Sequence, residues 1–211
     1  MTIEAAPIAV DPSGDLYVIF NLRCTLSCSH FIADQLLFCS LGVDGAWSAF
    51  SITVGTPPQQ LEVLASTEVA STWVVAVDGC GPNDAANCTQ ARGGEYDDRK
   101  SSSWNPKAIF QLGAEANLGY SGNAINGSYG YDTIGLLGKA GANNVSVNHQ
   151  VIAGLITEAF YVGSLGLSNQ AINFTDSGDS SPSLLTSLKN ENLIPSVSYG
   201  YTAGASYRKC Q

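Results

Sequence analysis

Few residues in this chain of 211 have types and spacings that could carry chemistry. The best set of metal ligands combines thiolate and imidazole, which zinc prefers: Cys24, Cys28, His30 and Cys39. Neither their spacing nor their flanking residues match a known zinc module, so we expect no metal and no cofactor. A serine nucleophile would need a histidine beside it, and the second histidine, His149, lies in a stretch without a pattern.

The elements that would position a site are clearest over residues 47–75. Positions 51–54 alternate polar and apolar residues, which is typical of a half-buried strand. The sequence G-T-P-P at 55–58 predicts a turn, and a second strand is expected over 61–65. Ser66-Thr67-Glu68 then predicts a short polar loop before a third apolar run that starts at Trp73.

This order of strand, G-T-P-P turn, strand, polar loop and W-V resembles the opening of the pepsin-like aspartic peptidases, whose loop reads D-T-G. The resemblance implies that Ser66 stands where that family has its catalytic aspartate, and Glu68 where it has a glycine. The family uses two carboxylates that share one proton. Ser66 cannot act as the base, and a side chain at the glycine position would point elsewhere. We therefore expect a degenerate triplet, Ser66, Thr67 and Glu68, and no catalysis.

Residues 120–133, YSGNAINGSYGYDT, predict a glycine-rich hairpin. The stretch resembles the flap of the pepsin-like family, with two early glycines replaced by Ser121 and Asn123. The resemblance implies that Tyr120 pairs with Trp73 across a cleft. It also implies a set of residues that bind a peptide: Tyr120, Trp73, Ser121 and Gly122. An ordinary surface hairpin with aromatic cross-strand packing is the alternative.

Two other stretches of the sequence resemble the catalytic triplet. Asp176-Ser177-Gly178 is a permitted form of the catalytic triplet, and Asp132-Thr133 begins another. Catalytic triplets in the family follow a hydrophobic strand, whereas Asp176 lies in a polar loop and Asp132 ends the flap pattern. We expect neither to be catalytic.

Later motifs extend the resemblance. Residues 161–167 resemble the segment that backs the first catalytic loop, with Val162 in place of its usual aspartate. A short helix is expected after Ser183 as N-cap, ending before Pro195. Its apolar face comes from three leucines: Leu184, Leu185 and Leu188.

Cysteines and sequons indicate the compartment. Cys80 and Cys88 bracket a turn-rich loop where pepsin-like proteins often have a disulfide, and we expect this pair to be bonded. Four sequons for N-glycosylation begin at Asn87, Asn126, Asn144 and Asn173. Together they favour the secretory pathway or the extracellular space, although residues 1–15 lack the features of a signal peptide.

The segment 16–40 is apolar and rich in cysteine, and it does not fit its surroundings. A buried hairpin or a short helix is one interpretation. We favour the hypothesis of a translated intron, because these residues permit a donor, a branch point and an acceptor that enclose whole codons. Sequencing the transcript would decide it.

Composition limits the partners. The net charge of −9 argues against nucleic acid, because it offers no means of neutralising a row of phosphates. An acidic surface that keeps the protein soluble is the simpler interpretation. No apolar run reaches the roughly twenty residues of a membrane span. The remaining expected partner is a peptide or protein segment in a half cleft.

Together, these patterns predict a mostly β fold: a single lobe of the bilobal pepsin-like acid protease β-barrel, with one or two short helices. We expect residues 1–43 to be an irregular N-terminal segment and 44–211 to be the N-terminal lobe, with the C-terminal lobe absent. Pairing two copies would only set Ser66 against Ser66. The alternatives are an aspartic endopeptidase in a full-length form and a truncated gene-model fragment without independent function.

Overall fold

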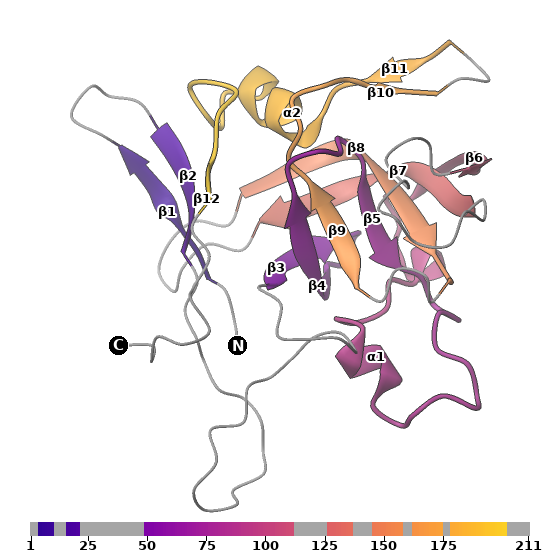
Figure 1. The fold of residues 1–211 in the computed structure, drawn as a ribbon. Helices are drawn as coiled ribbons and strands as arrows, with labels where there is room; N and C mark the ends of the chain where they lie inside the picture. Colours follow the sequence, from indigo (N-terminus) through magenta and orange to yellow (C-terminus); the bar gives the residue numbers. More distant parts are fainter. Residues whose placement is uncertain are drawn as a thin grey trace, which may run out of the picture.

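The computed structural model describes residues 4–10, 16–21, 49–111, 126–136, 145–157, 162–174 and 178–201 (Figure 1). The strands are β1 (Glu4–Val10), β2 (Leu16–Asn21), β3 (Ala49–Val54), β4 (Gln59–Ser66), β5 (Thr72–Val75), β6 (Asn105–Gln111), β7 (Asn126–Leu136), β8 (Val145–Leu155), β9 (Gly163–Gly166), β10 (Ile172–Asn173), β11 (Ser180–Ser181) and β12 (Gly200–Tyr201). The described α-helices are α1 (Cys88–Ala91) and α2 (Leu184–Asn190). The predicted mostly β class with short helices is confirmed.

Six strands close into a barrel in the order β3-β4-β9-β5-β8-β7, because β7 also pairs with β3. Strand β6 pairs with the first half of the same β7 edge. Strands β4 and β9 are parallel, as are β5 and β8, and the other neighbours are antiparallel. This barrel-like lobe matches the predicted single lobe of the pepsin-like fold.

The β3–β4 hairpin forms where the sequence predicts it, with Ile52 opposite Leu61. Gly55 in its turn has φ +88°, which favours glycine, and a Cβ there would lie 2.8 Å from Ser101 Oγ. On the polar face of β3, only 6 % of Ser51 is accessible, while Thr53 is half-buried. The Ser51 hydroxyl hydrogen bonds to the Glu62 carboxylate on β4, and burial raises the pKa of Glu62.

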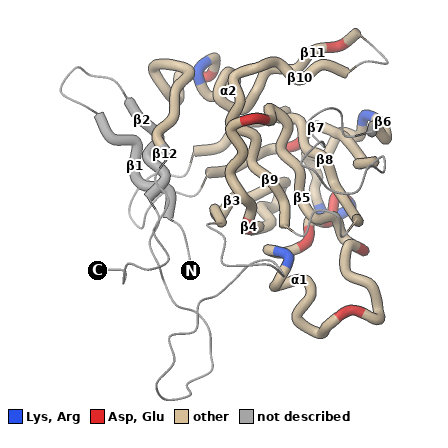
Figure 2. The backbone as a smooth tube through the Cα atoms, viewed as in Figure 1, with Lys and Arg blue, Asp and Glu red and all other residues tan. Residues whose placement is uncertain are grey.

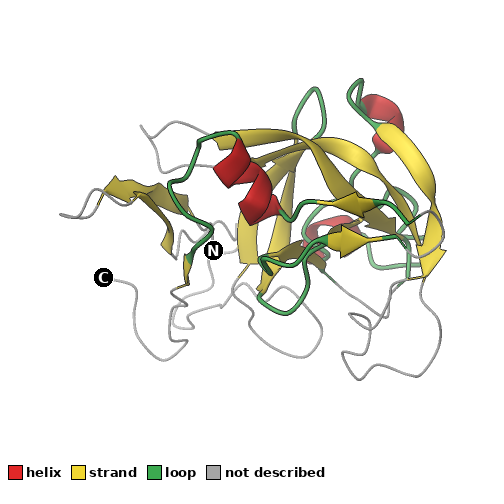
Figure 3. Cartoon of the chain, turned by 90° about the horizontal axis from the view of Figure 1, so that it is seen from above, coloured by secondary structure: helices red, strands yellow, loops and turns green. Residues whose placement is uncertain are grey.

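The main core lies between the barrel strands and α2, which Figure 3 shows against the strands. Leu184, Leu185 and Leu188 are buried there beside Ile152 of β8. Ser183 caps the helix by accepting a hydrogen bond from the Thr186 amide at 3.3 Å. The predicted helix, its cap and its apolar face are therefore confirmed.

Strands β1, β2 and β12 form a separate small sheet. Strand β2 pairs antiparallel with β1 and parallel with β12. Residues 4–10 and 16–21, which lie within the segment expected to be irregular, thus form strands. The division of the chain at residue 43 stays a prediction. Residues 22–40 lie outside the described residues, as do Cys24, Cys28, His30 and Cys39, so the intron hypothesis stays a prediction.

Candidate functional site

Ser66 is the last residue of β4, in the position expected for the first member of the triplet. It pairs with Gly166 of β9, and its carbonyl oxygen accepts a hydrogen bond from the Leu167 amide at 2.7 Å. Its side chain is half-buried, whereas Thr67 and Glu68 are exposed. The polar loop thus begins at a fixed point on the barrel wall and continues into solvent.

The far side of the loop, residues 69–72, is also hydrogen-bonded to β9 and to the residues that follow it. The Ser168 amide donates to the Val69 carbonyl at 3.0 Å, and the Gly166 amide donates to Thr72 Oγ1 at 3.2 Å. A Cβ on Gly166 would lie 2.6 Å from the Ala70 carbonyl carbon, so the two segments pass too closely for a side chain. We call the contacts of β9 and residues 167–168 with the 66–72 loop the β9 clamp.

The β9 clamp uses main-chain groups and the Thr72 hydroxyl. Among the described residues, the Ser66 side chain makes no hydrogen bond. The loop is therefore positioned without help from the side chain at residue 66.

Trp73, predicted to line the cleft, lies on β5 with 1 % of its surface accessible. It belongs to a second apolar cluster with Tyr129, Leu155 and Phe174. Tyr120, Ser121 and Gly122 lie outside the described residues. The pairing of Tyr120 with Trp73 and the peptide contacts of the hairpin therefore remain predictions.

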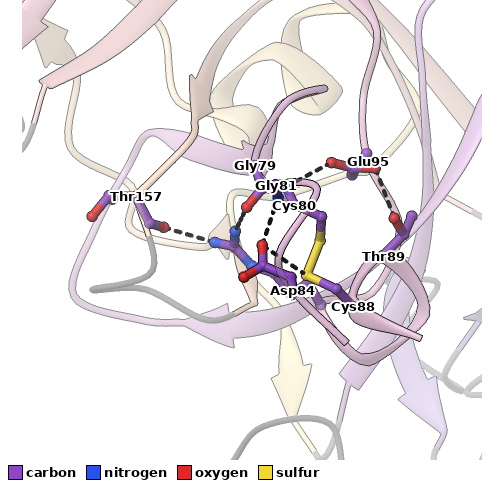
Figure 4. Close-up of a disulfide and its surroundings, with 9 residues drawn as sticks. Gly79, Cys80, Gly81, Asp84, Cys88, Thr89, Glu95 and Thr157 are labelled. Carbon is purple, nitrogen blue, oxygen red and sulfur yellow. Dashed lines mark hydrogen bonds between the residues drawn. A yellow bond between two sulfur atoms is a disulfide. The ribbon is translucent and has the colours of Figure 1, made fainter. Parts of the chain in front are cut away.

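The predicted disulfide between Cys80 and Cys88 is confirmed, with its two Cα atoms 5.9 Å apart. Glu95 lies beside it, accepting hydrogen bonds from the Cys80 amide at 3.1 Å and from Thr89 Oγ1 at 2.8 Å (Figure 4). The disulfide and this carboxylate together fix both ends of the exposed loop between the cysteines.

Arg92 is a residue that the sequence did not single out. Its guanidinium is buried and donates to the Gly79 carbonyl and, at 2.7 Å, to the Thr157 carbonyl. It thereby ties the disulfide loop to the chain that follows β8. No sequence pattern marks this role, because Thr157 is 65 positions away.

Asp132 was expected to be non-catalytic, and the structure gives its carboxylate three hydrogen bonds within the fold. Only 1 % of Asp132 is accessible, and it accepts hydrogen bonds from Tyr96 Oη, Ser103 Oγ and, at 2.7 Å, the Thr133 amide. Burial and this carboxylate raise the pKa of Tyr96 well above its usual range. We call Asp132 with these three donors the Asp132 hub.

Two further residues from the sequence analysis, Val162 and His149, are among the described residues. Val162 is buried directly before β9, and His149 is exposed and stacks on Tyr131 with ring centroids 4.1 Å apart. Asp176 lies outside the described residues.

The described sequon asparagines, Asn87, Asn126 and Asn173, are all exposed, while Asn144 lies outside the described residues. Charged positions are sparse along the barrel strands (Figure 2). In the part of the chain that the structure describes, no helix is long and apolar enough to cross a membrane.

Comparison with known proteins agrees with this architecture. No curated protein matches the chain. The family model described as eukaryotic aspartyl protease matches residues 49–207, a span that includes the barrel, the β9 clamp and the disulfide loop. Because this match covers more than half of the sequence, the chain belongs to the eukaryotic aspartyl protease family.

Proposed function

We propose that the chain is a non-catalytic lobe of the eukaryotic aspartyl protease family that retains a surface for binding extended peptides. The observation that carries the proposal is the hydroxyl of Ser66 at the end of β4, where the family resemblance places a catalytic aspartate. The proposal concerns the contribution of this lobe alone, because a complete cleft in the family also needs a second lobe.

The chemistry of a serine at this position supports the proposal. Peptide hydrolysis in the family needs one carboxylate to activate water while its partner protonates the carbonyl oxygen. A serine hydroxyl neither takes the proton from water at acidic pH nor shares one with a neighbouring carboxylate. Loss of a general base alone lowers the rate by roughly 10²–10⁴-fold. Glu68 does not replace it in our proposal, because its side chain is exposed two residues further along the loop.

Retention of the surrounding architecture supports peptide binding. The β9 clamp holds the 66–72 loop, and Trp73 is fixed in the apolar cluster under it. In our proposal, a peptide lies across this loop beneath the hairpin that carries Tyr120, Ser121 and Gly122. We assign residues 44–211 to this lobe. The confirmed disulfide further supports a secretory or extracellular location.

One titration tests binding and hydrolysis together. Oxidised insulin B chain, an extended peptide, would be added at acid pH to the isotope-labelled protein and followed by amide NMR, and the same sample analysed by mass spectrometry. We expect shifts of amides in 66–72 and 163–168 while the peptide stays intact. Absence of shifts at these amides would overturn the binding proposal. Pepstatin-sensitive cleavage would instead support the alternative, an aspartic endopeptidase.

A further inference from the structure

Two of the three large apolar residues that are exposed in the described part of the chain lie on β6 and just after β8. Among the described residues, Ile109 is 73 % exposed and Ile156 is 63 % exposed. Ile109 lies on β6, whose described pairing is with β7 alone, and Ile156 directly follows β8. An exposed edge strand with an apolar side chain favours unwanted pairing with other chains.

The strand register places one asparagine between these two side chains. Ser128 of β7 pairs with Ile109 on one side and with Gly154 on the other. Residues directly opposite each other, and residues two apart on a strand, share a face of the sheet. Asn126, two residues before Ser128, therefore shares a face with Ile109 and Gly154. Ile156 is the first residue after β8, at the end of the β7–β8 pair where Asn126 lies.

The distances on this face suit coverage by one attached group. Neighbouring strands lie about 5 Å apart, and diagonal neighbours in a sheet lie about 7–8 Å apart. Asn126 is itself exposed. Both isoleucines are thus within reach of a group of two or three sugar rings attached to the Asn126 side chain.

Asn126-Gly127-Ser128 is a complete sequon within the described strand β7. The asparagine and the serine are exposed, whereas Gly127 is buried. A Cβ on Gly127 would lie 2.8 Å from Leu155 Cδ2, so the middle position faces the interior. The confirmed disulfide between Cys80 and Cys88 indicates folding in an oxidising compartment, which is where N-glycans are attached.

We propose that Asn126 carries an N-linked glycan whose first sugars cover Ile109 and Ile156. In the modification, Asn126 Nδ2 forms a bond to the anomeric carbon of a lipid-pyrophosphate-linked oligosaccharide. The bond from that carbon to the pyrophosphate oxygen breaks, and the lipid pyrophosphate leaves with the electron pair. The amide loses one proton to a base of the transferring enzyme.

The other described sequons lack this apolar setting. Asn173 on β10 pairs with Ser180, and both are exposed. In the sequon of Asn87, the middle residue is the disulfide-bonded Cys88, and the Thr89 hydroxyl donates to Glu95. A glycan at Asn126 therefore has a function in covering apolar surface that a glycan at Asn173 lacks, and Asn173 serves as a matched control.

The test is to secrete the full chain from a eukaryotic host that attaches N-glycans, alongside a control glycoprotein. Peptide mapping after enzymatic deglycosylation in heavy-oxygen water reports occupancy at each sequon. We expect occupancy at Asn126 in the wild type and in S128T, which keeps the sequon, and its loss in N126Q and S128A. Aggregation measured by light scattering should rise in N126Q and S128A but not in N173Q.

A second set of variants separates coverage from a general effect of glycans on folding. Replacing both isoleucines, in I109T/I156T, should remove the difference in aggregation between the N126Q background and the glycosylated chain. An unoccupied Asn126, while the control glycoprotein is glycosylated, would overturn the proposal. Equal aggregation of N126Q and wild type, or a difference that persists with both isoleucines replaced, would overturn the covering role.

Discussion

The β9 clamp and the Asp132 hub hold the chain in opposite ways. Around Ser66, the contacts come from main-chain groups and the Thr72 hydroxyl, and the side chain at residue 66 contributes no hydrogen bond among the described residues. At the Asp132 hub, the carboxylate itself accepts three hydrogen bonds from groups up to 36 positions away. We therefore expect the fold to depend on the side chain at residue 132 and to tolerate change at residue 66.

In our proposal, this difference explains how a serine at the position of the catalytic aspartate leaves the fold intact. A loop that is fixed by its backbone keeps its shape when the side chain changes. A buried hub cannot change in this way, because each donor left without a partner costs free energy.

Replacing the carboxylate of the hub should have the largest effect. D132A leaves Tyr96 Oη and the Thr133 amide without their acceptor, whereas Ser103 Oγ keeps Thr56 Oγ1 as an acceptor. We expect the free energy of unfolding to fall by roughly 3–5 kcal/mol. Urea denaturation followed by tryptophan fluorescence measures it. D132N is the matched control and should lose less, because its amide oxygen still accepts. A D132A protein as stable as the wild type would show that the Asp132 hub does not stabilise the fold.

A substitution that crowds the main chain of the β9 clamp should destabilise the fold more than a substitution of the Ser66 side chain. G166A places a Cβ against the Ala70 main chain, where nothing flexible can move aside, and we expect a loss of roughly 1–3 kcal/mol. Thermal unfolding by circular dichroism reports the change. G200A is the control, since a Cβ at that exposed glycine meets no atom within 4 Å and its φ is not in the left-handed region. Equal effects of the two substitutions would contradict the close approach.

The hub also predicts a pH dependence. The pKa of Tyr96 is raised in the folded state by burial and by the Asp132 carboxylate, so folding favours the protonated phenol. This contribution is complete below the unfolded-state pKa of about 10 and is lost as pH rises above it. Y96F should cost about 1 kcal/mol at neutral pH, where a hydrogen bond is lost. Its stability should also fall less than that of the wild type above about pH 10. Parallel stability curves in alkali would show that Tyr96 does not titrate as proposed.

Substitution at Ser66 should have the smallest effect on the fold. S66A removes a half-buried hydroxyl that bonds to no described residue, and we expect a change within about 0.5 kcal/mol. The same urea denaturation measures it, beside D132A. A loss comparable to that of D132A would mean that the side chain at residue 66 supports the loop after all.

The sequence predicted the local elements better than the interactions between them. The alternation at 51–54, the G-T-P-P turn and the leucines of α2 are local patterns, and each predicted element is present. The Cys80–Cys88 pair was predicted because the family resemblance placed it in a short loop. The burial of Ser51 was not predicted, because it depends on the contact with Glu62 across the hairpin.

The hub and Arg92 could not be predicted, because neither leaves a local signal. Asp132 and Tyr96 are 36 positions apart, and Arg92 and Thr157 are 65 apart, so only the closed barrel brings them together. Of the candidate site, the position of the triplet at the end of β4 was predictable from the strand pattern. The contribution of Tyr120, Ser121 and Gly122 remains a prediction because these residues lie outside the described ones.

The central claim is that this lobe keeps its shape but does not hydrolyse peptides, and turnover is its most direct test. Purified wild type and S66A would be assayed side by side at acid pH against a peptide library, with and without pepstatin, using mass spectrometry to find new termini. Our account predicts no pepstatin-sensitive cleavage by either protein. Cleavage by the wild type that pepstatin inhibits and S66A lacks would contradict it.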